Sequence, residues 1–150
     1  MSKSWKLILL GLIPLAVGYI MNYTLIQLPI PGVLLYVIEI GLLFLWGYLA
    51  YRVSAHDKNP VLQAFLMNSF GLFMLVLILC QELILGHFWH GMVGHATQMY
   101  FLPLLSLVAR IMVFAIRAMA PIRIWPFCVV IWISMFAVCC VGCVKKQKSI

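Results

Sequence analysis

The sequence predicts an all-α fold, a polytopic integral membrane bundle of helices. Of its 150 residues, 66% are hydrophobic and 9% are charged, whereas soluble domains carry about 25% charged residues. The apolar residues also come in runs that approach the ~20 residues a transmembrane helix needs. No stretch is left over for a separate soluble domain, so residues 1–150 are expected to form a single transmembrane domain.

The first predicted helix covers residues 5–25. Lys3 and Lys6 precede its apolar stretch, as they would in a signal peptide, but the apolar character continues to Leu25, beyond a normal signal core. We therefore expect an uncleaved helix. Pro14 is a candidate kink, because proline lacks the backbone donor of a regular helix.

A proline marks the start of each of the next two predicted helices, residues 31–52 and 60–85. Pro31 suits a first helical turn, where its missing N–H is not needed. Asn59 is a good N-cap residue and stands directly before Pro60, which gives the third helix a clear start.

The remaining apolar runs predict helices at 102–120 and 126–144. The first of these carries Arg110 and Arg117, which are seven residues apart and therefore share a helical face. It is either a fifth transmembrane helix or, in a four-span alternative, an interfacial helix on the membrane surface. We choose five spans, because an interfacial helix should have a broad polar face and this run is otherwise apolar.

The distribution of basic residues does not separate the two topologies. In the five-span arrangement the inner basic residues are Lys3, Lys6, Arg52, Lys58, Arg117 and Arg123. In the four-span alternative they are Lys3, Lys6, Arg52, Lys58, Lys145, Lys146 and Lys148. Both arrangements leave three basic residues outside, so the positive-inside rule is satisfied by either.

Glu39 and Arg110 form a candidate intramembrane ion pair. Each follows the start of its predicted helix by eight residues. If both helices run in the same direction, both charges lie about 12 Å below the same surface. A charge inside a bilayer is costly unless it is paired. We expect the pair to hold two helices in register, with a proton- or ion-coupled transport site as the alternative.

A second candidate site combines Glu82 with three histidines, His87, His90 and His95. Histidine and carboxylate side chains are ligands for zinc and other divalent metal ions. The spacing contains no His-Glu-x-x-His motif, and histidine and tryptophan rings also favour a membrane interface. An interfacial loop is the preferred interpretation and a divalent metal site the alternative; no other cofactor is expected.

A third candidate site is the C-x-x-C pair Cys140 and Cys143. Such a pair can cycle between thiols and a disulfide when one thiol is activated by its surroundings. The chain has five cysteines and no second pair at this spacing. Small packing residues are therefore the preferred interpretation and redox chemistry the alternative.

These patterns predict a small multi-pass protein of an inner or plasma membrane. We expect a non-enzymatic membrane subunit, accessory protein or transporter-like bundle; the alternative is a membrane-embedded enzyme that uses the histidine loop or the cysteine pair. The formal charge of +7 lies mostly at the ends of apolar runs, where basic residues orient helices and meet lipid headgroups. The expected partners are thus the bilayer and a membrane protein or further copies of the chain, not nucleic acid.

Overall fold

The predicted all-α bundle is confirmed by a computed structural model, which describes residues 3–55, 58–87, 89, 91–116 and 123–149. Within these ranges the regular elements are helices. In chain order they are α1 (Lys3–Leu10), α2 (Ile13–Gln27), α3 (Gly32–Val53), α4 (Pro60–Met67), α5 (Ser69–Leu79), the π-helix η1 (Cys80–Leu85), α6 (Met92–Ile116) and α7 (Trp125–Lys148).

Several of these helices have the length and composition of membrane spans. In the described part of the chain, four segments qualify, namely Trp5–Gln27, Gly32–Val53, Met92–Met112 and Trp125–Lys148. A fifth is obtained if α4 is joined to α5 and η1, although this pair is bent by 55° at Asn68. Length and composition alone therefore leave the number of spans open.

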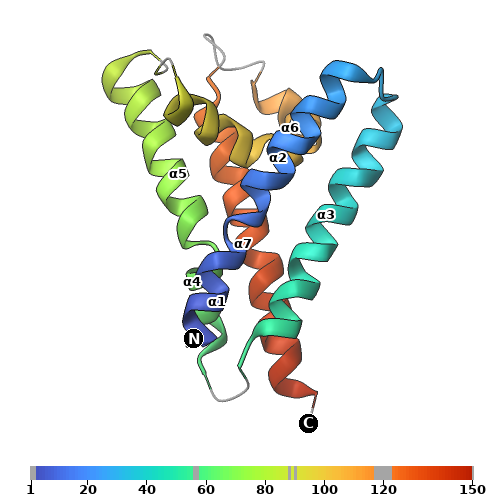
Figure 1. Cartoon of the computed structure of the whole chain (residues 1–150), viewed down its shortest axis with the longest axis vertical. Coiled ribbons are helices and arrows are strands. Elements are labelled where there is room, and N and C mark those ends of the chain that lie inside the picture. Colours follow the sequence, from blue (N-terminus) through green and yellow to red (C-terminus); the bar gives the residue numbers. More distant parts are fainter. Residues whose placement is uncertain (1–2, 56–57, 88, 90, 117–122, 150) are drawn as a thin grey trace.

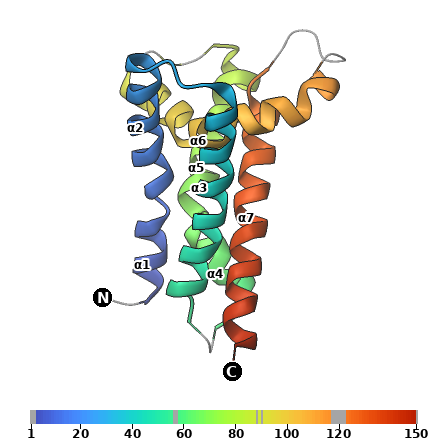
Figure 2. The ribbon, with the colours of Figure 1, turned by 90° about the vertical axis from the view of Figure 1, so that its right-hand side faces the viewer.

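The arrangement in space favours the four-span alternative. α1 with α2, α3, α4 with α5, and α7 run along the bundle, whereas α6 runs across its upper part (Figures 1 and 2). Both chain ends lie at the opposite, lower end (Figure 1). Our five-span choice would place those ends on different sides. α6 is the least apolar and most buried of the four candidate segments, so it gains least from contact with lipid.

The predicted helix ends agree with the structure where a proline marks them. Asn59 caps α4, because its side-chain oxygen accepts hydrogen bonds from the N–H groups of Val61 (2.9 Å) and Leu62 (3.4 Å). Pro14 lies in the first turn of α2, so the expected kink is a full break between α1 and α2. The predicted helix 102–120 instead begins at Met92, and its residues 117–120 lie outside the described residues.

The two broken helices meet at their breaks. Gly11, between α1 and α2, lies against the end of α4, and a Cβ added to it would be 2.7 Å from the carbonyl oxygen of Met67. Asn68 follows directly, between α4 and α5. The absence of a side chain on Gly11 lets the two chain segments approach this closely.

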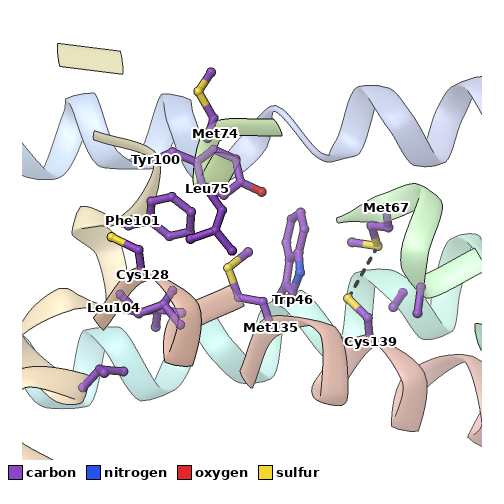
Figure 3. Close-up of a cluster of buried hydrophobic side chains, with 14 of the residues drawn as sticks. Trp46, Met67, Met74, Leu75, Tyr100, Phe101, Leu104, Cys128, Met135 and Cys139 are labelled. Atoms are coloured by element: carbon purple, nitrogen blue, oxygen red, sulfur yellow. Dashed lines mark hydrogen bonds between the residues drawn. The ribbon is translucent and has the colours of Figure 1, made fainter. Parts of the chain in front are cut away.

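Glycine also allows close contact between α3 and α7. Gly47 of α3 and Gly142 of α7 face each other, and a Cβ on Gly142 would collide with the carbonyl oxygen of Gly47. Small residues at such crossings bring backbones together, as is common in membrane helix pairs. The buried core around these helices includes Trp46, Met67 and Met135 (Figure 3).

Candidate functional site

Glu39 is fully buried on α3 and both of its carboxyl oxygens are hydrogen-bonded. Oε1 accepts from the hydroxyl of Ser106 (2.5 Å) and Oε2 accepts from the backbone N–H of Leu107 (2.6 Å). Both donors belong to α6, so the carboxyl group joins the transverse helix to a lengthwise one.

The two donors to Glu39 are adjacent residues of α6, Ser106 and Leu107, about one turn after Pro103. Proline lacks a backbone N–H and its ring crowds the carbonyl four residues earlier, so Pro103 disturbs the helix before these donors. The carboxyl group of Glu39 therefore bonds to the middle of α6 from a neighbouring helix.

The predicted ion pair between Glu39 and Arg110 is not present among the described residues. Arg110 is exposed and lies one turn beyond Ser106 on α6. Glu39 contacts this helix through Ser106 and Leu107 and not through Arg110. The reason is physical: a hydroxyl and an N–H already satisfy both carboxyl oxygens, so no arginine is needed.

Glu82 has a similar role at the start of α7. Its Oε1 accepts from the N–H of Ile124 (2.9 Å), and its Oε2 accepts from the N–H of Trp125 (2.8 Å). α7 has no side-chain cap of its own at Ile124. A carboxylate at this end also interacts favourably with the helix dipole. Glu82, carried by η1, therefore caps α7 from another element.

The structure does not gather the predicted metal ligands into one site within the described residues. His90 lies outside them. The Nδ1 atom of His87 is 2.9 Å from the carbonyl oxygen of Leu85, and His95 is exposed in the first turn of α6. Both carboxyl oxygens of Glu82 accept hydrogen bonds at the start of α7, as described above. His87 and His95, the described histidines of the proposed set, thus have different surroundings.

The cysteines are free thiols along α7 and η1. Cys143 is buried and Cys140 is half-buried. Cys139 is packed in the core, with its Sγ 3.9 Å from the Sδ of Met67 (Figure 3). Cys140 and Cys143 remain on one helix three residues apart, and redox activity of this pair stays a prediction.

A polar residue that the sequence reasoning missed joins three segments of the bundle. Asn68 is fully buried at the bend between α4 and α5. Its Oδ1 accepts from Trp46 Nε1 of α3 (3.3 Å), and its backbone carbonyl accepts from Trp132 Nε1 of α7 (3.2 Å). An asparagine inside an apolar run was the available signal, since such a residue needs partners in lipid.

A second polar residue, Gln63, holds the connection before α4. Its side-chain amide donates to the carbonyls of Ala55 (2.9 Å) and Lys58 (3.0 Å). Its Oε1 accepts from the N–H of Ala55. The buried amide therefore satisfies backbone groups that the turn leaves free.

Three buried polar atoms lack a hydrogen-bond partner in the described part of the chain: Gln81 Nε2, Tyr100 Oη and Trp125 Nε1. Tyr100 also lines an apolar cleft between α2, α3, α6 and α7. The other buried polar groups discussed above hold helices together.

Comparison of the chain with protein-family models, with curated proteins and with solved structures gave no match.

Proposed function

We propose that the chain is a non-enzymatic integral membrane protein that acts as a subunit or accessory protein through its outer surface. The observation that carries this proposal is the use of the buried acidic side chains. Glu39 and Glu82 each bind backbone N–H groups of a neighbouring helix. Groups used in this way stabilise the bundle and are not free to transfer protons or hold substrate.

The distribution of charge supports an orientation in a membrane. The lower end of the bundle carries both chain ends and most basic residues, namely Lys3, Lys6, Arg52, Lys58, Lys145, Lys146 and Lys148. Basic residues concentrate on the cytoplasmic side of membrane proteins. We infer that this end faces the cytoplasm, in an inner or plasma membrane.

The outer surface supports a partner within the membrane. Phe44 of α3 is 74% exposed and Phe73 of α5 is 56% exposed. Within the bilayer these aromatic side chains contact lipid, another protein or a second copy of the chain. Aromatic residues are enriched in protein interfaces, and we propose that one of these faces is such an interface.

Photocrosslinking in cells tests this proposal. A photoreactive phenylalanine analogue is placed at Phe44 or at Phe73, which lie on different helices and serve as controls for each other. The expected result is a discrete protein adduct from one position and lipid adducts alone from the other. Lipid adducts alone from both, together with the native mass of a single chain, would contradict an accessory role.

The membrane-enzyme alternative makes different predictions. A metal enzyme should retain a stoichiometric divalent ion that is lost on His87→Ala or His95→Ala. A thiol enzyme should show Cys140 and Cys143 partly oxidised when thiols are trapped in living cells. Either result would replace the proposed function by an enzymatic one.

A further inference from the structure

A groove runs along the outer surface of the bundle between α3 and α7. The two helices pack side by side and descend together to the end that carries both chain ends (Figures 1 and 2). Its lining includes Gly47 and Gly142, which are buried where the helices cross, and Phe44 and Val141, which are exposed. Because the two glycines have no side chains, the groove stays open at the crossing.

The groove has the size of a site for one lipid chain. Its volume is about 650 Å³, within the range of about 300–1,000 Å³ that is typical of small-molecule sites. On α7 it extends from Ala137 to Lys145, which at ~1.5 Å per residue is about 12 Å. Half of a bilayer core is about 15 Å thick. The groove therefore covers most of the depth of one leaflet.

The groove changes from apolar to basic toward its lower end. Phe44 and Ala137 are its uppermost lining residues, whereas Tyr51 and Lys145 are its lowermost. The Lys145 side chain is exposed, so its charge is accessible from the groove. Tyrosine and lysine are typical of the membrane interface. A lipid of this leaflet has the matching order, with its chains in the core and its headgroup at the interface.

Two further cations lie beside the basic end of the groove. The guanidinium carbon of Arg52 is 5.8 Å from the ring centre of Tyr48, and the Nζ of Lys146 is 5.2 Å from the ring centre of Tyr51. Both tyrosines line the groove. Such contacts between a cation and an aromatic ring are attractive, so they hold the two charges close to the position of Lys145.

The acidic side chains that the structure describes do not neutralise these cations. Glu39 bonds to Ser106 and Leu107 of α6, and Glu82 bonds to the start of α7. The positive charge at the lower end of the groove is therefore available to an anion from outside the chain. Basic pockets between membrane helices on the cytoplasmic side bind anionic lipid headgroups in this way.

We propose that the groove binds one anionic phospholipid of the cytoplasmic leaflet, with an acyl chain along Gly47 and Gly142 and its phosphate beside Lys145. A second copy of the chain is a poorer occupant, because in the same orientation it would bring its own cations to the same depth, and like charges across an interface are unfavourable.

The site depends on the orientation inferred above but goes beyond the proposed function, because a subunit role does not require a selected lipid. It assigns the face that carries Phe44 to lipid. The face that carries Phe73 is then the one available to a protein partner.

Photolabelling of the purified full chain in nanodiscs tests the headgroup contact. The probes are phosphatidylglycerol and phosphatidylcholine that carry the same diazirine in the same acyl chain. Lys145→Gln removes the charge from the groove. Lys6→Gln is the matched control, because Lys6 is an exposed lysine of α1 at the same end of the bundle.

The readout is the ratio of phosphatidylglycerol to phosphatidylcholine labelling at Phe44, Tyr48 and Ala137, which line the groove. Lys145→Gln should lower this ratio about fivefold, as expected for one basic residue at a membrane surface, and Lys6→Gln should leave it unchanged. An unchanged ratio in Lys145→Gln would overturn the proposal. An equal fall in both variants would do so too, because it would indicate general attraction to the basic end and not a site.

A second pair of variants tests the groove itself. Val141→Trp fills the groove from an exposed position, and it should reduce labelling of the lining residues by both probes. Ile133→Trp is the matched control, because Ile133 is also exposed on α7 but does not line the groove. It should change neither labelling. Labelling that is unaffected by Val141→Trp would show that no lipid chain occupies the groove.

Native mass spectrometry identifies the occupant. From nanodiscs with equal amounts of the two lipids, the chain should be released with one bound phosphatidylglycerol. Equal retention of both lipids, or a pair of chains without bound lipid, would overturn the proposal, and the second result would assign the groove to a second copy. No partner protein is present in this experiment, so its failure leaves the accessory role, which is tested in cells, unaffected.

Discussion

The backbone N–H of Leu107 donates to the carboxyl group of Glu39 across the contact between α6 and α3, at 2.6 Å. The neighbouring Ser106 hydroxyl donates to the other carboxyl oxygen at 2.5 Å. A buried acid is thus hydrogen-bonded by a backbone N–H and a hydroxyl, without a basic residue. This relationship changes what should be expected of substitutions at Glu39.

A double-mutant cycle should couple Glu39 to Ser106 and not to Arg110. Ser106→Ala removes one donor and should lower the free energy of unfolding in detergent by about 1 kcal/mol. In the Glu39→Gln background its effect should differ by about 0.5 kcal/mol or more, since residues in contact couple. Arg110→Ala should be additive with Glu39→Gln. Coupling to Arg110 alone would restore the ion pair predicted from the sequence.

Removal of the cap on α7 should also destabilise the bundle. Glu82→Ala leaves the N–H groups of Ile124 and Trp125 without their acceptor, which should cost about 1 kcal/mol and at most about 2 kcal/mol. Chemical unfolding in detergent measures the change. Leu83→Ala, an exposed position on the same element, is the control and should have a smaller effect. If the two variants behave alike, Glu82 does not act as a cap.

The crossing of α3 and α7 should tolerate no added side chain. Gly142→Ala places a Cβ against the carbonyl oxygen of Gly47, and such overpacking costs about 1–3 kcal/mol. Gly41→Ala is the same change on α3 at a site with open space, and it should be neutral or stabilising by up to about 1 kcal/mol. Thermal unfolding of the two variants in one detergent compares them directly. Similar unfolding temperatures would contradict the close approach of the two backbones.

Topology reporters should place both chain ends in the same compartment. A reporter fused before residue 1 and another fused after residue 150 are expected in the cytoplasm, and one inserted at Gly86 outside it. This follows from α6 lying across the bundle (Figure 2). Ends on opposite sides would establish the five-span arrangement instead.

The sequence was sufficient for those features that depend on neighbouring residues. Asn59 and Pro60 defined the start of α4, because capping and the first turn are local interactions. Long apolar runs predicted the all-α class, because they too are a property of neighbouring residues in the sequence. The depth argument for Glu39 assumed that α6 runs along the bundle beside α3, which does not agree with its transverse direction.

The features that were missed depend on contacts between distant segments. Glu39 and Leu107 are 68 residues apart, and the helix that carries Leu107 begins at Met92, ten residues before the predicted start at 102. Glu82 and Trp125 are 43 residues apart, and nothing local to either predicts their contact. The direction of α6 likewise follows from packing and not from composition, since its apolar content alone would permit a span.

The meeting of the two helix breaks at Gly11 and Asn68 has a consequence for how the lower half of the bundle packs. A Cβ added to Gly11 would lie only 2.7 Å from the Met67 carbonyl oxygen, so any side chain at residue 11 would push the two breaks apart. α1 and α4 begin or end at these breaks, so the packing of both short helices depends on one residue that has no side chain.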